Sequence, residues 1–332
     1  MTRALVTGGS GFIGAHVVRA LIEEGVEVRT LVRGEGEPEN LRSLPVERAV
    51  GDLTDAASLE RALDGVDVLF HVAALYELAG EGARMRAVNV EGTRALMHAA
   101  LRAAVDQVVH TSSVAAVGYA AADDTPAAES QWANEDELAG PYEESKYHSE
   151  RLVQAMVAKE GLPAVVVNPT APIGPLDVKP TPTGRLIVDA ANGDLPGYLR
   201  SAGLNIVHVR DVAAGHVLAW RRGRVGERYI LGNAEGNLTL REVMARAAAQ
   251  TGRKAPQLPL PWIVAMAYAQ LDDRWNRRRG RAPRAPIAGV RLAKHRMWFD
   301  PSKAIEELGL PQTPLDEAFR DAVSYFREQG RV

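Results

Sequence analysis

The chain has 332 residues, of which 46% are apolar and 24% charged, and its formal net charge is −3. This composition is typical of a soluble globular protein with one large or two smaller domains. The nearly balanced charge excludes a general attraction to nucleic acid or to membranes. There are no cysteines, which excludes disulfides and thiolate chemistry and fits a reducing, cytoplasmic location. The apolar run at the N-terminus is too short for a signal peptide.

The first half of the chain alternates strand-like with helix-like segments. Short apolar runs predict strands at residues 4–7, 27–32, 46–50, 66–70, 107–111 and 164–168. Helices are predicted between them at residues 12–24, 56–63, 85–104 and 142–159. This order predicts an α/β fold with a doubly wound parallel sheet of the Rossmann type. Its ligand crevice should lie at the carboxyl ends of the strands.

The second half of the chain has a different character, because five prolines fall between residues 169 and 182. Shorter elements follow, with helices predicted near residues 185–191, 212–220, 240–251, 262–274 and 315–329, and a strand at 228–231. We therefore expect a dinucleotide-binding domain over residues 1–168 and a smaller, mainly helical substrate lobe over 169–332, with some later segments returning to the first domain.

Two segments of the lobe are unusual in composition. The apolar stretch 258–271 is too short to span a bilayer and predicts a buried helix. The stretch 274–284 contains six arginines beside Trp275, and a solvated helix end is favoured there over a phosphate site.

A glycine-rich segment joins the first strand to the first helix. Thr7, Gly8, Gly11 and Gly14 give a tight turn, close backbone approach to a pyrophosphate, and close packing of the helix on the sheet. The helix N-terminus adds free N–H groups and a positive dipole end. This order of strand, loop and helix predicts dinucleotide binding, with Phe12 and Ile13 beside the cofactor.

The end of the second strand should select the cofactor. An acidic residue there would bind the ribose hydroxyls of NAD(H), whereas a nearby arginine would bind the 2′-phosphate of NADP(H). The strand ends at Val32-Arg33 with no acid, which favours NADP(H), although Glu35 leaves NAD(H) possible. Asp52, followed by Leu53, is placed to bind the adenine amino group, unless it caps the next helix, a role for which Asp55 competes.

A tyrosine and a lysine four residues apart, Tyr142 and Lys146, should share one face of a helix. A nearby ammonium lowers the pKa of a phenol, so we expect Tyr142 to act as an acid and base. The fifth strand ends in Ser112-Ser113, and Ser113 is favoured as the hydroxyl that enters the crevice because neighbouring strand residues face opposite ways. The scattered histidines predict no metal site.

The glycine pattern and the Tyr-x-x-x-Lys pair together resemble the extended short-chain dehydrogenase/reductases, and the likeness spans nearly the whole chain. Within that family the segments 178–185 and 189–193 resemble the hopanoid-associated sugar epimerases, which are close to dihydroflavonol-4-reductase-like proteins. The resemblance implies that Tyr142 is the general acid/base, Lys146 binds the nicotinamide ribose, and Ser113 orients the substrate carbonyl. It also implies that Asn89 is a proton relay or a structural amide. Ala73, Asn168 and Pro169 are expected near the cofactor. A homodimer is expected to form through the helices at 85–104 and 142–159.

Three functions follow in order of preference. The first is an NAD(P)-dependent reductase or dehydrogenase that interconverts a ketone and a secondary alcohol. The second is an NAD-dependent nucleotide-sugar epimerase, and the third a dinucleotide sensor without catalysis. A nucleotide sugar would need diphosphate-binding cations in the lobe. The residues that could contact an anionic or polyhydroxylated substrate, or could equally be ordinary surface residues, are Lys179, Arg185, Tyr198, Arg200, His208 and Arg210.

Overall fold

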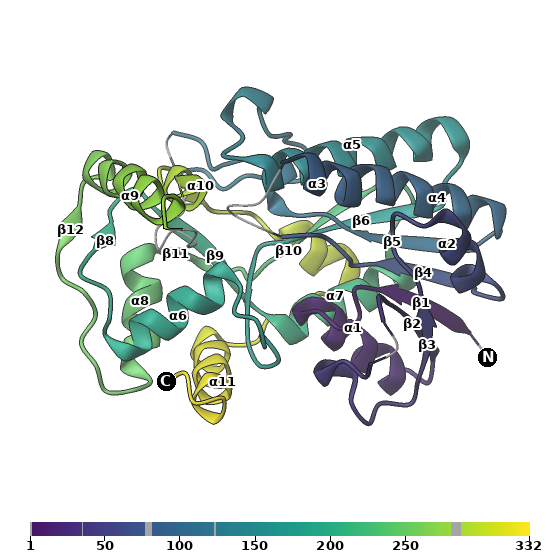
Figure 1. Cartoon of the computed structure of the whole chain (residues 1–332), viewed down its shortest axis with the longest axis horizontal. Helices are drawn as coiled ribbons and strands as arrows, with labels where there is room; N and C mark the ends of the chain where they lie inside the picture. The colour runs from purple at the N-terminus through teal and green to yellow at the C-terminus, as the bar shows by residue number, and fades with distance from the viewer. Residues whose placement is uncertain (1, 35, 77–81, 123, 280–286) are drawn as a thin grey trace.

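A parallel seven-stranded sheet forms one half of the molecule (Figure 1). The computed structural model describes residues 2–34, 36–76, 82–122, 124–279 and 287–332. The strands of the sheet are β1 (Arg3–Thr7), β2 (Glu27–Val32), β3 (Val46–Val50), β4 (Val68–His71), β5 (Gln107–Thr111), β6 (Ala164–Pro169) and β10 (Arg228–Leu231). Their spatial order is β10-β6-β5-β4-β1-β2-β3. The chain therefore adds β2 and β3 on one side of β1 and then returns to add β4 and the later strands on the other side. This reversal opens a crevice at the carboxyl ends of β1 and β4 and confirms the predicted doubly wound fold.

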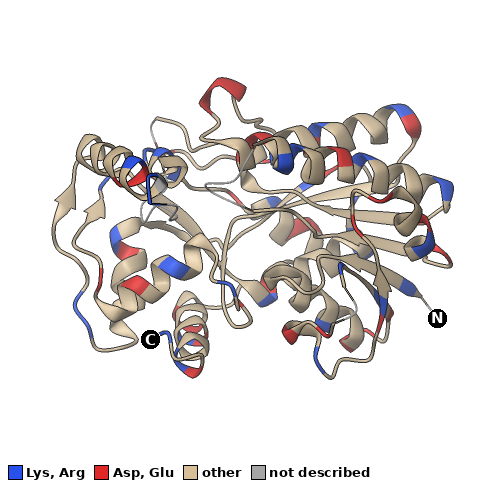
Figure 2. Cartoon of the chain, viewed as in Figure 1, with Lys and Arg blue, Asp and Glu red and all other residues tan. Residues whose placement is uncertain are grey.

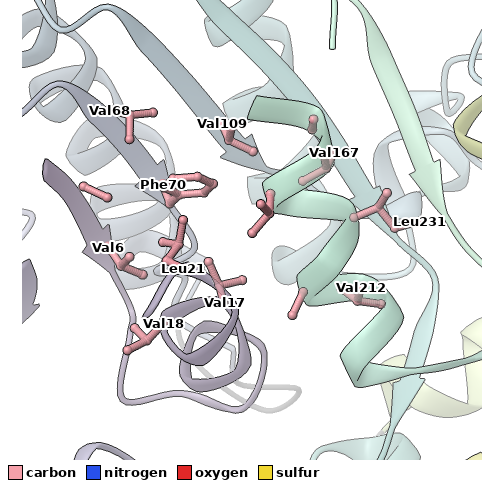
Figure 3. Packing of buried hydrophobic residues seen from close by; sticks show 14 of the residues in the cluster. Val6, Val17, Val18, Leu21, Val68, Phe70, Val109, Val167, Val212 and Leu231 are labelled. Atoms are coloured by element: carbon pink, nitrogen blue, oxygen red, sulfur yellow. The ribbon is translucent and has the colours of Figure 1, made fainter. Parts of the chain in front are cut away.

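Helices cover both faces of this sheet because its strands are apolar on both sides. They are α1 (Phe12–Glu23), α2 (Ala56–Leu63), α3 (Gly82–Arg86), α4 (Gly92–Arg102), α5 (Pro141–Glu160) and α7 (Val209–Arg222). One face is packed by α1 and α7, and Val17 and Leu21 of α1, Val212 of α7 and Phe70 of β4 belong to the same buried cluster (Figure 3). The other face is packed by α2, α4 and α5.

The helix predicted over residues 85–104 is interrupted. A π-helical turn at Ala87–Glu91 separates α3 from α4. Such turns are uncommon and frequently occur at functional sites. Here the turn contains Asn89, whose side chain bonds to the backbone of Leu75.

The smaller lobe combines helices with short strands. Its helices are α6 (Pro182–Asn192), α8 (Leu240–Ala249), α9 (Trp262–Arg277), α10 (Ile287–Leu292) and α11 (Leu315–Glu328). Its strands are β7 (Ala171–Ile173), β8 (Tyr198–Leu199), β9 (Gly203–His208), β11 (Asn237–Thr239), β12 (Pro259–Leu260) and β13 (Arg296–Met297). The sequence-based prediction lacks β9, which pairs with β7, β11 and β13 and forms the centre of a small sheet.

Three elements that follow residue 168 belong spatially to the first half. The strand β10 pairs in parallel with β6, α7 packs against α1, and the π-helical turn Ala304–Leu308 shares their buried cluster. We therefore propose that the dinucleotide-binding domain comprises residues 1–168 together with α7, β10 and this turn, and that the rest of the described chain after residue 168 forms the lobe.

The expectation of a buried helix at residues 258–271 is wrong. Ile263 is 76% exposed and Leu271 is 69% exposed, whereas Ala269 of the same helix is fully buried. The helix α9 rests on α10 along one side only, where the Trp262 indole donates to the Val290 carbonyl at 2.8 Å. Apolar composition therefore did not decide burial here, because α10 is the main element of the described chain that packs against this helix.

Candidate active site

Two positions of the glycine loop accept only glycine. Gly8 has φ +72°, and a Cβ there would lie 2.7 Å from the backbone nitrogen of Ala73. A Cβ on Gly14 would lie 2.1 Å from the Gly8 carbonyl oxygen, so the helix could not approach the loop. The first turn of α1 has Gly11 as its N-cap and no side-chain cap, which leaves its N–H groups available for an anion.

A cavity of about 970 Å³ runs from this loop to the lobe. Most of the predicted cofactor residues line it. These are Gly8, Gly11, Phe12, Ile13, Gly14, Arg33, Asp52, Leu53, Ala73 and Pro169. The volume is at the upper end of what small-molecule sites usually have, which suits a dinucleotide together with a second ligand.

Three residues predicted near the cofactor do not line the cavity. The hydroxyl of Thr7 pairs with His71 Nδ1 at 2.8 Å inside the sheet. The amide of Asn168 donates to the Ser113 carbonyl at 3.0 Å and to the Glu150 carboxylate at 2.7 Å. The Lys146 ammonium donates to the Thr111 carbonyl at 2.7 Å and is buried. In this structure all three support the backbone that frames the cavity.

The cofactor-selecting end of β2 contains no described acid. Leu31, Val32 and Arg33 line the cavity there, and Glu35 lies outside the described residues. Asp55 caps α2 by accepting from the backbone of the helix, so Asp52 does not serve as that cap. Hydrogen bonds from Thr54 lower the pKa of Asp52, and the charge of Arg33 lowers it further.

Tyr142 lies in the first turn of α5, which begins at Pro141. Its ring meets Tyr76 edge to face, with ring centroids 4.2 Å apart, and both rings line the cavity. Burial raises the pKa of Tyr142 to about 12, while a hydrogen bond with the Ser113 side chain opposes the shift. The direction is therefore opposite to the predicted lowering by Lys146, because burial raises the pKa of Tyr142 and the charge of Glu143 raises it further.

The two serines after β5 differ in their partners. The Ser113 side chain bonds to Tyr142 and also accepts from the backbone of Ala115 at 3.2 Å. The Ser112 hydroxyl is buried, and no described group bonds to it. Both serines line the cavity. The geometry joins Ser113, rather than Ser112, to Tyr142, as the strand alternation predicts.

Lys146 and Asn89 lie behind Tyr142, away from the cavity. Burial lowers the pKa of Lys146 to about 8, and the charge of Glu150 opposes this shift. Asn89 accepts from the Leu75 N–H at 2.7 Å and donates to the Ser145 hydroxyl at 2.9 Å. Its amide thus joins the π-helical turn to α5 and to the chain after β4, which corresponds to the structural alternative for this residue.

Some residues of the site carried no usable sequence signal. Tyr76 follows β4 in a loop, and only the fold places its ring on Tyr142. Glu143 is also buried at the cavity, where burial raises its pKa to about 7 and the backbone N–H of Ala139 bonds to it. His295, from a distant part of the chain, stacks on Tyr119 with ring centroids 4.3 Å apart.

The lobe side of the cavity is mostly apolar. Its lining residues are Pro169, Thr170, Ala171, Pro172, Thr181, Pro182, Thr183, Leu186, Ala202, Gly203, Leu204, Leu240, Gly289, Leu292, Ala293, His295 and Met297. None of the six candidate substrate contacts is among these described residues. His208 is buried against Asp321, and Arg210 pairs with Glu317 on the surface. Within the described residues, no cluster of three His, Asp or Glu side chains could hold a metal, and no helix could cross a membrane.

Comparison with known proteins agrees with this geometry. A model of the NAD dependent epimerase/dehydratase family matches residues 4–232. A putative dihydroflavonol 4-reductase from Synechocystis sp. is 42% identical, covering 98% of this chain and 95% of that protein. Sterol demethylase protein B from Methylococcus capsulatus is 38% identical, covering 99% of each chain. The crystal structure of gox2253 is 42% identical and superposes with a TM-score of 0.88 over all of both chains.

Proposed function

Because the chain belongs to the NAD-dependent epimerase/dehydratase family, we propose that it is an NADP(H)-dependent reductase acting on an apolar ketone. The reaction is reversible, so the same site oxidises the corresponding secondary alcohol. One observation carries the proposal: the lining that the described lobe contributes contains no lysine or arginine, the two arginines of the cavity, Arg33 and Arg84, come from the dinucleotide-binding half, and Tyr142 and Ser113 bond to each other.

The chain's own residues would handle the proton in this reaction. Bound NADPH supplies the hydride. Burial keeps the proton on Tyr142 at neutral pH, which is the state that a proton donor to a carbonyl oxygen needs. The Ser113 hydroxyl, already bonded to Tyr142, would hold the same carbonyl oxygen. The buried ammonium of Lys146 would exchange its Thr111 carbonyl for ribose hydroxyls when the cofactor binds.

The apolar lining supports a bulky, uncharged substrate. Leu204, Leu292 and Met297 offer dispersion contacts and exclude water. A nucleotide sugar carries a diphosphate, and the described lobe lining offers no lysine or arginine to neutralise it, so its burial against the lobe would be costly. The similarity to a protein named for sterol demethylation is in accord with an apolar substrate.

The preference for NADP(H) rests on Arg33. Its side chain lies at the end of β2, lines the cavity and is exposed, so it can meet a 2′-phosphate without loss of a buried partner. The loop that would receive the diphosphate of either dinucleotide fits that role, because α1 begins there without a side-chain cap and because glycine at positions 8 and 14 lets the loop pack against Ala73 and against the helix.

The test is turnover by wild-type protein and by Tyr142→Phe. Phenylalanine keeps the ring contact with Tyr76 but removes the hydroxyl, so NADPH affinity should stay within about twofold while ketone reduction falls about 10²–10⁴-fold. The substrates are a panel of steroid and long-chain ketones, with nucleotide sugars as the comparison set. Near wild-type turnover by Tyr142→Phe would refute the assigned acid.

The epimerase alternative makes a different prediction. An epimerase retains NAD through turnover and consumes no reducing equivalents. Tightly held NAD in the purified protein, with interconversion of nucleotide sugars and no oxidation of added NADPH by ketones, would replace the reductase proposal.

A further inference from the structure

The outward face of α9 carries large apolar side chains in solvent. They are Ile263 (76% exposed), Val264 (55%), Tyr268 (54%), Leu271 (69%) and Trp275 (59%). The last four are spaced by four, three and four residues, which places them in one stripe along the helix. A helix that rests on a protein normally turns such a stripe inward. The stripe is therefore unpartnered within the described chain.

Charge is distributed unevenly on the same helix. Most of α9 carries no charged residue, and charge occurs only near its C-terminal end (Figure 2). Arg274, Arg278 and Arg279 are exposed there, next to and beyond Trp275. Asp272 and Asp273 are only partly exposed, and the side chain of Asn276 donates to Asp272 at 2.7 Å. The exposed arginines outnumber these two carboxylates, so the solvent-facing side of this end carries a net positive charge.

The aromatic residues of the stripe also have a distinctive setting. The Arg279 guanidinium lies 4.2 Å from the centroid of the Trp275 ring. Tryptophan and tyrosine are enriched at the level of lipid headgroups, because one end of each side chain is apolar and the other polar. Arginine beside them would meet phosphate groups.

From these features we propose that the outward face of α9 docks on the surface of an anionic lipid bilayer. The helix would lie in the plane of the headgroups, with its stripe among the upper acyl chains and its arginines on the phosphates. Nucleic acid is a poorer fit, since it would require cations along the whole face. The proposal goes beyond the proposed reaction, because lipid binding is a property of this surface alone.

The position of α9 leaves the surface accessible and close to the cavity. The helices α4 and α5, through which a homodimer is expected, extend towards the opposite end of the long axis (Figure 1). On the other side of α9 lies α10, whose Gly289 and Leu292 line the cavity. Docking would bring the lobe side of the cavity near the bilayer, where an apolar substrate would partition.

The test is co-sedimentation of the full chain with vesicles. One set contains phosphatidylcholine alone, and the other contains equal parts of phosphatidylcholine and phosphatidylglycerol. Wild-type protein should sediment with the anionic vesicles and much less with the neutral ones. The double variant Leu271→Glu/Trp275→Glu should bind at least tenfold more weakly. The matched control is Val225→Glu, which changes a residue of similar exposure (53%) in the other half of the molecule.

The arginines are tested separately. Each cation near an anionic surface contributes about fivefold in affinity, so Arg274→Glu/Arg278→Glu should reduce binding about 25-fold or more. The control is Arg48→Glu, an exposed residue on β3. Binding by wild-type protein should also weaken as salt rises from low to physiological concentration. This measurement needs no variant and so stands if a variant fails to fold.

Three results would overturn the proposal. The first is wild-type protein that stays in the supernatant with both vesicle sets. The second is equal binding by the α9 variants and their controls. The third is a wild-type oligomer, seen by sedimentation velocity, that Leu271→Glu/Trp275→Glu dissociates while vesicle binding is absent, because a second copy of the chain would then be the occupant.

Discussion

The variant Gly14→Ala tests the close packing of α1 against the glycine loop, because helix propensity and tertiary structure predict opposite changes in stability. Gly14 lies in the first turn of α1. Local helix propensity alone predicts that alanine would stabilise the protein by about 0.5–1 kcal/mol, because glycine is a poor helix former. The tertiary structure predicts the opposite, since the new methyl group would lie 2.1 Å from the Gly8 carbonyl oxygen and 2.7 Å from its carbonyl carbon.

The magnitude follows from the nature of the clash. Both atoms belong to the backbone, so no rotamer change can relieve it, and either the loop or the helix must move. Overpacking of this kind typically costs about 1–3 kcal/mol. A net loss of about 2 kcal/mol in a chain of this length corresponds to a fall of roughly 3 °C in Tm. Movement of the Gly8 peptide would also deform the anion cradle, so dinucleotide binding should weaken at least tenfold.

Thermal unfolding and calorimetric titration with NADPH measure the two effects. The matched control is Gly289→Ala, a helical glycine of α10 whose Cβ would meet nothing within 4 Å. That variant should be as stable as wild type or more stable by up to about 1 kcal/mol. If Gly14→Ala were also stabilised and bound NADPH normally, the close packing of helix and loop would not be the reason for this glycine.

Three further predictions concern the cofactor, the serines and the buried histidines. Arg33→Ala should raise KM for NADPH by about 10–100-fold and leave KM for NADH nearly unchanged, since the lost bond is to the 2′-phosphate; equal effects on both would count against the assigned role. Ser113→Ala should lower kcat at least tenfold, whereas Ser112→Ala should change it less than threefold, as steady-state kinetics would reveal. Burial lowers the pKa of His16 and of His216 from 6.5 to about 4, so the unfolded chain binds protons first as the pH falls. The contribution of these two histidines to the free energy of unfolding should therefore be constant above pH 7 and decline between pH 6.5 and 4, by up to about 1.4 kcal/mol per pH unit for each, while the raised pKa of Glu143 opposes the decline; urea titrations in which wild type and His216→Gln differ by the same free energy at pH 7 and 5 would contradict this.

Features set by neighbouring residues were predictable from the sequence. The alternation of strands and helices in the first half follows from apolar periodicity, which the chain carries locally. The glycine loop follows from the spacing of Gly8, Gly11 and Gly14 between a strand and a helix. The pair Tyr142 and Lys146 shares a helix because of its four-residue spacing. Each of these patterns spans few residues, so its physical cause is present in the segment itself.

Features that depend on distant neighbours required the tertiary structure. Thr7, Asn168 and Lys146 stand in the expected segments, yet none of them lines the cavity, and their polar atoms bond to other groups of the protein. The pKa of Tyr142 rises because the surrounding fold buries its ring. The strand β9 and the apolar lobe lining form only when segments from residue 169 to 297 come together.

The clearest division lies between the chemistry of the site and its surroundings. Spacing along the chain determined which groups could transfer a proton and hold a dinucleotide, because helices and strand ends fix the relative positions of near neighbours. Burial and exposure were decided by contacts between segments far apart in sequence. That is why the apolar helix α9 lies exposed at the surface and why the described lobe contributes no lysine or arginine to the cavity lining.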